Sequence, residues 1–449
     1  MVIKWLKQQG YNTIDESYRA YIKMWGQWYK GRVPSIHNYI QFNGAQRLRR
    51  CRKTLGMAKR ICEDWANLLL NEKVQITASD EVANEIISKD LERNHFSIYG
   101  NQLIEKAFAF GTGAFVEYFD NGNVIDYITA QNIYPLTWDN GDITECAFAS
   151  ERKDGDDKYI YLNIHRLEDG LYVIENHLLK VGKSKSSLTE VSLPEGLEPV
   201  FNTGSSVPRF QIIYPNIANN IDLDSPLGVS VYANALDQLE TCDVIYDSFF
   251  NEFNLGRKRI MIPMSMARIM LQNNGETIPV FDENDLCFYA YQTDDKSQRI
   301  EEMNGELRTA AHIDALSEAV NMTAYKCGLG EHKYKFNGSG VKTATEVVSE
   351  DSEMFRSVRK HEAVIASAIT GLYKALADMN GLSTDFDVHV DFDDSIIEDT
   401  DAERTRDRQD VLDGIMSKAE YRVKWYGETA QQAEMAVQGI QSMDAIMGF

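Results

Sequence analysis

Apolar side chains recur every three or four residues over most of the first 111 positions, a spacing that predicts amphipathic helices. One helix is predicted from Asp15, a helix-capping residue type, to about Gly31. A second is predicted over about 46–71, and two shorter helices are expected near 80–94 and 97–110. The second helix takes its apolar stripe from Leu55, Ile61, Cys62, Trp65, Leu68 and Leu69.

From Ala114 to Leu179 the pattern changes to short runs of strand-forming residues between turns. Asp-Gly and Asn-Gly steps supply the positive φ angles that tight hairpins need, so these runs predict an antiparallel meander. A proline-rich connection with one further strand, at about 209–215, follows the meander. Helices and antiparallel strands that occupy separate stretches of the chain indicate an α+β fold. The turn signals lie at 120–123, 139–142, 153–157 and 168–170.

Two further predicted helices flank another strand-rich segment. The first follows Pro226 and spans about 228–256, with aromatic and aliphatic side chains at helical spacing. Strand-like runs then occupy 259–292, and the second helix spans about 305–328. The chain therefore leaves one helix, makes a short β excursion and returns along another helix.

A basic loop precedes the longest predicted helix, in a chain whose net charge is -22. Thr343 and Glu346 have the spacing of a capping box and start this helix, which at ~1.5 Å per residue is a rod of about 55 Å. A strand at 386–392 and two helices, at about 400–416 and 417–447, complete the chain. The loop carries Lys333, Lys335, Asn337, Gly338, Gly340 and Lys342.

The acidic composition limits the classes of function. A pI near 4.8 argues against a general basic face that wraps nucleic acid, although it allows brief contact through a few local cations. The six cysteines form no CxxC pair and have no histidine at zinc-finger spacing, so reduced thiols are expected. The N-terminal residues lack the apolar core of a signal peptide, and no run of ~18 apolar residues is present. These features predict a soluble protein that remains inside a cell or joins a particle assembled there.

No catalytic, metal or cofactor site is predicted. The Gly-Lys-Ser at 182–184 has His177 where a phosphate-binding loop needs glycine, and it follows antiparallel strands. The acidic group around Asp391, Asp393 and Asp394 is interpreted as a solvated face, because it lacks the glycine and closing glutamate of a calcium loop. Neither HExxH nor GxSxG occurs. Paired carboxylates for a hydrolase stay open as an alternative, but nothing selects two of them.

Several arginines lie together between positions 45 and 60, where no acidic residue occurs. Because the rest of the surface is acidic and attracts such a patch, we expect a solvated or subunit-pairing face rather than a nucleic-acid site. The candidates for subunit pairing are Arg47, Arg49, Arg50 and Arg52.

The order of these elements resembles that of the portal proteins of tailed double-stranded DNA phages, of the siphophage type. Three local sequence segments are also similar to those of portal proteins. They are SPLGVSVYANALDQLETCDVIYDSFFNEF at 225–253, YKCGLGEHKYKFNGSGVKTATEVVSEDSEMF at 325–355 and ICEDWANLLLNEKVQI at 61–76. The resemblance implies a ring of about twelve subunits. It also implies a wing (1–227 and 343–399), stem helices (228–256 and 305–328), a clip (257–304), a channel loop (329–342) and a helical crown (400–449).

The resemblance implies a mechanical function rather than an enzymatic one. The ring would sit at one capsid vertex of the virion, after assembly in the host cytoplasm, and would pass double-stranded DNA during packaging and ejection. The implied partners are the packaging ATPase (the terminase large subunit), head–tail connector proteins, and the major capsid and scaffolding proteins. No cofactor and no membrane are implied. The implied clip contacts are Arg257, Lys258 and Arg259. The channel loop would present to DNA Lys333, Lys335, Asn337, Gly338, Gly340 and Lys342.

Two alternatives remain open from the sequence. An adaptor or minor head protein of a phage would lack the order of helix, β excursion and returning helix. An acidic intracellular hydrolase would form a small oligomer with a concave pocket, whereas a portal protein forms a large ring without turnover.

Overall fold

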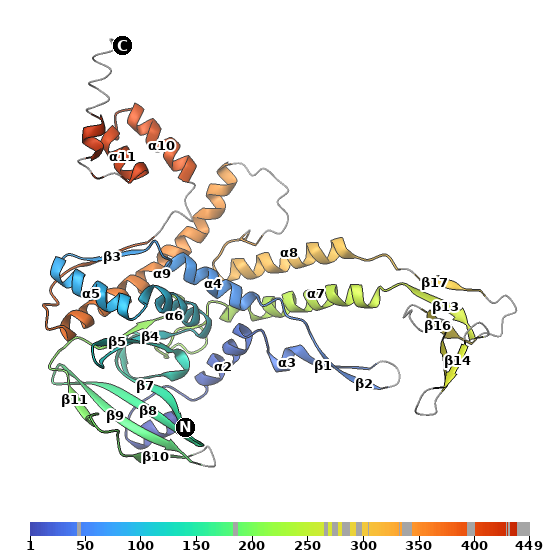
Figure 1. Ribbon diagram of the computed structural model, residues 1–449, viewed down its shortest axis with the longest axis horizontal. Coiled ribbons are helices and arrows are strands. Elements are labelled where there is room, and N and C mark those ends of the chain that lie inside the picture. The colour runs from blue at the N-terminus through green and yellow to red at the C-terminus, as the bar shows by residue number, and fades with distance from the viewer. Residues whose placement is uncertain are drawn as a thin grey trace, which may run out of the picture.

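The computed structural model shows a body, a long projection and a separate helical part near the C-terminus (Figure 1). The projection consists of two helices that run side by side to a β-rich tip (Figure 1). The structure describes residues 1–42, 46–182, 187–264, 268–271, 277–280, 288–292, 299–303, 305–331, 333–334, 344–392, 400–427, 429 and 432–437.

One predicted element near the N-terminus is wrong. The predicted helix over 46–71 is instead a strand followed by a shorter helix, because Gly56 adopts a left-handed φ of 74° that interrupts a helix at that point. The sequence at 38–51 contains an Asn-Gly step between two short runs, which is a hairpin signal. The observed elements are α1 (Val2–Gln8), α2 (Tyr18–Tyr29), α3 (Pro34–His37), β1 (Asn38–Phe42), β2 (Arg47–Cys51) and α4 (Met57–Leu69).

The next two predicted helices are confirmed as α5 (Glu81–Arg93) and α6 (Phe96–Phe110). Asp80 begins α5, since its Oδ1 accepts hydrogen bonds from the amides of Val82 and Ala83 at 2.9 and 3.0 Å. The two helices pack against each other and support the sheets that follow.

The predicted meander is confirmed, but it divides between two sheets. A three-stranded sheet has the order β12-β4-β5, and a larger sheet has the order β10-β9-β8-β7-β6, with β11 also pairing with β9. Asn121, Asn140 and Asp169 adopt positive φ at the turns that the sequence predicts. The strands are β3 (Gln75–Ala78), β4 (Gly113–Phe119), β5 (Asn123–Thr129), β6 (Ile133–Asp139), β7 (Asp142–Asp154), β8 (Asp157–Glu168), β9 (Leu171–Val181), β10 (Leu188–Val191), β11 (Val200–Asn202) and β12 (Phe210–Ile213).

The second half of the chain contains the predicted helix, β excursion and returning helix, with shorter helices than expected. The first helix begins at residue 236 rather than 228, because the segment before it is buried in the body and ends in a single 3-10 turn. The long predicted helix is confirmed as α9 (Ala344–Met379). The other elements are α7 (Leu236–Leu255), β13 (Arg259–Pro263), β14 (Arg268–Leu271), β15 (Thr277–Val280), β16 (Phe288–Tyr291), β17 (Glu301–Met303), α8 (Thr309–Lys326), β18 (Val388–Asp391), α10 (Thr400–Leu412) and α11 (Lys418–Tyr426).

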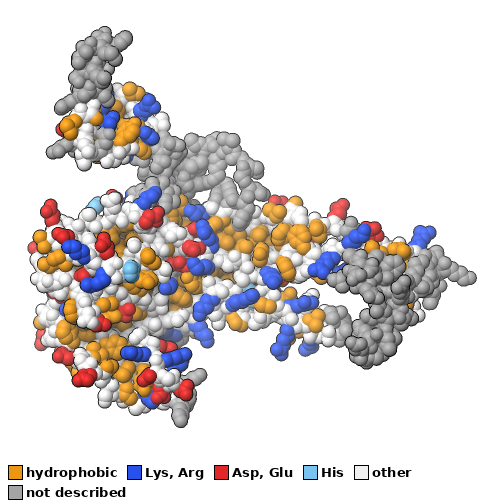
Figure 2. Space-filling view, in the orientation of Figure 1, with side chains coloured by type: hydrophobic (Ala, Val, Ile, Leu, Met, Phe, Trp, Pro, Cys, Tyr) orange, Lys and Arg blue, Asp and Glu red, His pale blue; other side chains and the backbone are white. Residues whose placement is uncertain are grey.

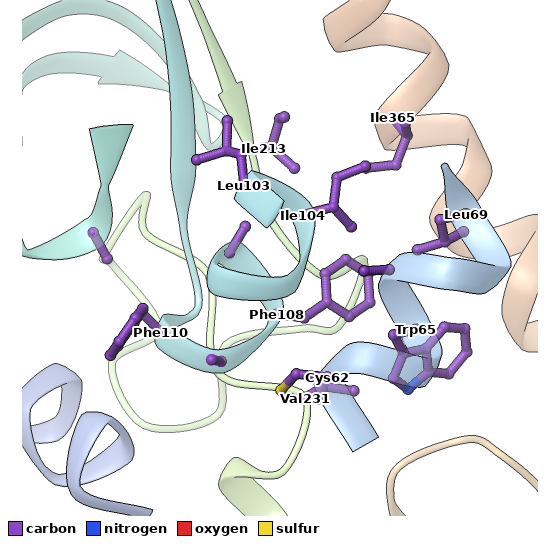
Figure 3. Packing of buried hydrophobic residues seen from close by; sticks show 14 of the residues in the cluster. Cys62, Trp65, Leu69, Leu103, Ile104, Phe108, Phe110, Ile213, Val231 and Ile365 are labelled. Atoms are coloured by element: carbon purple, nitrogen blue, oxygen red, sulfur yellow. The ribbon is translucent and has the colours of Figure 1, made fainter. Parts of the chain in front are cut away.

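The main core lies where α4, α6 and α9 meet in the body. Figure 3 shows Trp65, Phe108 and Ile365, one from each of these helices, directed toward the same region. All three side chains are 1% exposed or less. A second, smaller core lies under the larger sheet, where Trp5 and Leu6 of α1 pack against Leu162. Both cores belong to the body, so the projection extends from a well-packed base.

Candidate functional site

The projecting helices α7 and α8 contact each other through polar and aromatic groups along their length. Cys242 and Thr323 lie near the base, with Sγ and Oγ1 3.4 Å apart. Further out, the hydroxyl of Ser248 lies 3.2 Å from Nε2 of His312. These contacts keep the two helices paired from the body toward the tip.

An ion pair closes the outer end of the helix pair. The guanidinium of Arg308 donates to both carboxylate oxygens of Glu252, at 3.1 and 2.7 Å, and the Arg308 amide donates at 3.0 Å. The hydrogen bonds from Arg308 lower the pKa of Glu252 to about 2. The carboxylate is therefore ionised at every physiological pH, and the ion pair between Glu252 and Arg308 does not depend on pH in that range.

The base of α7 is fixed by a buried contact between a histidine and a carboxylate. Nε2 of His37 lies 2.9 Å from Oδ2 of Asp243, and both side chains are almost fully buried. The Val33 amide donates to Nδ1 of His37 at 2.8 Å, which places the ring proton on Nε2, where it donates to Asp243. The other oxygen of Asp243 accepts from the amide of Leu55 at 2.7 Å. One carboxylate thus joins α7 to α3 and to the segment before α4.

The tip is a small sheet centred on β13, which pairs parallel to β16 and antiparallel to β17. The three predicted clip cations lie where α7 gives way to β13. Lys258 makes a 2.7 Å ion pair with Glu302 of β17, and the guanidinium of Arg259 lies 5.9 Å from the ring centre of Tyr289. Arg257 is exposed, and its contact among the described residues is a 3.4 Å hydrogen bond from its guanidinium to Asn254. Of the three, Arg257 is the one most open to another molecule.

The return from α8 to the basic loop is held against the body. Nε1 of Trp65 donates to the carbonyl of Cys327 at 3.1 Å, directly beside Gly328, whose φ is 79°. The hydroxyl of Tyr334 donates to Asp64 at 2.6 Å, and Arg60 pairs with the same carboxylate at 2.7 Å. Burial, followed by the hydrogen bond with Asp64, raises the pKa of Tyr334. Tyr334 therefore remains a neutral donor.

Sequence reasoning did not find the contact between Tyr334 and Asp64. The sequence gives one indication of this contact: Asp64 is an acidic residue among the apolar, buried residues of α4, where a carboxylate needs a hydrogen-bond partner. Of the predicted loop residues, the structure describes Lys333, which is half-buried. Lys335, Asn337, Gly338, Gly340, Lys342 and Thr343 lie outside the described residues, as does the side chain of Glu346.

The predicted pairing arginines lie on the β1–β2 hairpin and just beyond it, not on a helix. Arg52 is engaged within its own chain, since its Nη1 donates to the carbonyl of Ile36 at 2.8 Å and lies 3.9 Å from Glu240. Arg47, Arg49 and Arg50 are exposed and make no ion pair with any residue that the structure describes. The hairpin therefore presents three cations that no described acid neutralises, in a chain whose net charge is -22.

The described part of the chain contains no cluster of three or more His, Cys, Asp or Glu side chains arranged for a metal ion. Asp393, Asp394, Glu398 and Asp399 lie outside that part. A pocket of about 280 Å³ on the larger sheet is lined by His177, Glu175 and Glu190, far from the helix pair in the fold. Its histidine already lies 2.7 Å from Glu190.

The body carries a projecting helix pair with a β-rich tip (Figure 1). The projection exposes apolar side chains, which is typical of a surface that binds other molecules. The chain belongs to the family described as phage portal protein, SPP1 Gp6-like, whose sequence profile matches residues 9–436. This is a portal protein of tailed phages, a component of the capsid vertex that serves DNA packaging, and its family is structural rather than enzymatic.

No curated protein matches the chain. Among the helices described, none has the length and apolar character needed to span a bilayer.

Proposed function

We propose that about twelve copies of this chain form a closed ring at one capsid vertex, with the paired helices α7 and α8 arranged around a channel for double-stranded DNA. The observation that carries the proposal is the projecting helix pair with its β-rich tip in a chain of the portal family. A ring built by repeating one head-to-tail contact closes without leaving an unpaired surface. The net charge of -22 suits a channel past which DNA slides without adhering.

The proposal divides the chain into the regions of a portal subunit. Residues 1–227 and 343–399 form the wing, and the crown occupies 400–449. The stem comprises the helices within 228–256 and 305–328, of which 236–255 and 309–326 are helical. The clip lies at 257–304, and the channel loop at 329–342.

The clip would dock the packaging ATPase, the terminase large subunit, while the capsid fills, and head–tail connector proteins afterwards. Arg257 is the strongest candidate for such contacts, because Lys258 is paired with Glu302 and Arg259 lies over Tyr289. Assembly in the host cytoplasm would also involve the scaffolding and major capsid proteins. The finished ring would belong to the virion.

The channel loop would touch passing DNA briefly. Lys333, Lys335 and Lys342 would meet phosphates, while Gly338 and Gly340 let the loop bend. Tyr334, bound to Asp64, would fix the start of the loop, and the capping box of Thr343 and Glu346 would fix its end. Such contacts are local and do not read sequence.

The test is the mass and shape of the purified full-length chain, measured by native mass spectrometry and negative-stain microscopy. We expect a ring of about twelve copies with a central hole. A chain that remains monomeric or dimeric, also when it is produced together with its scaffolding protein, would overturn the proposal. A ring of another size would change the copy number alone.

A further inference from the structure

The β1–β2 hairpin has one face that nothing in its own chain covers. Ile40 pairs with Arg49 and Phe42 pairs with Arg47 across the two strands, so these four side chains share a face. Ile40 and Phe42 are each 65% exposed. Residues on the opposite face are better covered, since Leu48 is half-buried and Tyr39 lies under the guanidinium of Arg52 at 5.2 Å.

The hairpin is anchored firmly at its base. The His37–Asp243 pair holds the residue before β1, and Arg52 contacts the carbonyl of Ile36 just after β2. The Lys53 amide donates to Asp247 of α7 at 2.9 Å. An arm with a fixed base presents its free face at a defined position beside α7, so it is suited to a specific contact.

Helix α8 carries a complementary stripe on the side that faces away from α7. Thr323 and His312 contact α7, and at 3.6 residues per turn the opposite side of α8 presents Asp314, Glu318 and Met322. Neither acid makes an ion pair with any described residue. Met322 and Tyr325, one turn apart, are 53% and 50% exposed. Figure 2 shows hydrophobic side chains gathered along this helix.

We propose that the Ile40–Arg49 face of the hairpin docks onto the α8 stripe of the neighbouring copy in the ring, an inference that rests on the proposed ring. The two surfaces match in chemistry, because each has two exposed apolar side chains and two charges that form no ion pair with a described residue. These charges are positive on the hairpin and negative on α8. In one chain α8 and the hairpin lie on opposite sides of α7 (Figure 1). When the hairpin side of each copy binds the α8 side of the next copy, repetition of this contact generates a head-to-tail ring.

The test compares two neighbouring arginines on the same strand. The strand register divides the arginines that the sequence suggests for subunit pairing: Arg49 lies on the docking face, and Arg50 lies on the opposite face, outside the proposed contact. Arg49→Glu therefore reverses a charge on the docking face, whereas Arg50→Glu reverses the same charge away from it. Assembly is followed by mass photometry over a range of protein concentrations, with far-UV circular dichroism as the check on folding. We expect Arg49→Glu to raise the concentration needed for half-assembly by at least about tenfold, and Arg50→Glu by less than about twofold.

Rescue and cross-linking identify the partner surface. Glu318→Arg combined with Arg49→Glu restores the opposite charges, and we expect assembly to return to within about threefold of the wild type. A chain with Arg49→Cys, mixed with a chain with Glu318→Cys, both carrying Cys51→Ser, should form a disulfide-linked dimer under mild oxidation. Each cysteine variant alone should not.

The outcomes separate this inference from the proposed function. A wild-type ring with equal effects of Arg49→Glu and Arg50→Glu, no rescue and no mixed disulfide would overturn the docking contact and leave the ring intact. Failure of the wild type to form any ring would overturn both.

Discussion

The body and the projecting helix pair are stabilised in different ways. In the body, α4 has nine buried residues among thirteen, whereas α7 has three among twenty. Phe250, Phe253 and Leu255 on α7 are 44%, 48% and 66% exposed, although aromatic and aliphatic side chains of this size usually gain free energy when buried.

This difference indicates what each region is for. Long helices in water obtain most of their stability from packing of an apolar face, and the single chain supplies little of that packing to α7 and α8. Exposed apolar area that continues along two helices is typical of an interaction surface. The body therefore holds the fold, and the projection presents an exposed apolar surface of the kind that contacts other molecules.

The sharpest test of this comparison is a pair of aromatic truncations. Trp65→Ala removes a fully buried indole, with its hydrogen bond to Cys327, and should lower the free energy of unfolding by about 4 kcal/mol. Phe250→Ala removes a half-exposed ring on α7 and should cost less than about 1 kcal/mol in the same measurement. Urea denaturation of the unassembled chain supplies both values, and equal losses would contradict the comparison.

The joint between the two regions should be the next most sensitive place. His37→Leu leaves the Asp243 carboxylate buried without its imidazole partner, and should destabilise the chain by roughly 3 kcal/mol. Amide exchange measured by mass spectrometry should show faster exchange in β1, β2 and the first turns of α7.

A control for this joint is Glu240→Ala, which removes from α7 the partly exposed partner of Arg52 and leaves the hydrogen bond from Arg52 to the Ile36 carbonyl in place. It should change stability by less than about 1 kcal/mol. If His37→Leu left the exchange of the hairpin unchanged, the buried pair would not be what anchors it.

A buried acid in the body makes the free energy of unfolding depend on pH, whereas the Glu252–Arg308 ion pair of the projection stays ionised across the same range. Burial raises the pKa of Glu117, on β4, from 4.5 to about 8, so the folded chain binds a proton that the unfolded chain releases above pH 4.5. Stability from this residue is greatest below pH 4.5 and is lost as pH rises toward 8.

Glu117→Gln should remove this dependence. Between pH 5 and pH 8 the unfolding free energy of the wild type should fall relative to the variant by up to about 1.4 kcal/mol per pH unit. Buried His165, whose pKa burial lowers to about 3, makes the opposite contribution below pH 6.5 and is present in both proteins. Parallel curves for the two proteins would show that Glu117 is ionised in the folded chain.

The sequence was sufficient for elements with strong local signals. The Asn-Gly and Asp-Gly turns located the meander, and helical spacing located α5, α6 and α9. The prediction of a helix is wrong at 46–56, because the apolar stripe that supports it begins only at Leu55 and Gly56 interrupts a helix there. The pairs His37–Asp243 and Tyr334–Asp64 join residues 206 and 270 positions apart, and no local pattern specifies such contacts.

The smallest expected effect concerns the helical part near the C-terminus, which has its own local stabilisation. Ser417 and Glu420 form a capping box at the start of α11, with the Glu420 amide donating to the Ser417 hydroxyl at 3.1 Å. Ser417→Ala should speed amide exchange at the first turn of α11 by about fivefold, the loss typical of one helix cap. The urea midpoint of the body should not move, because no residue of α11 is buried and its ion pair, Lys424 to Asp407, lies within the same helical part. A shift in the body midpoint would mean that this helical part and the body unfold together.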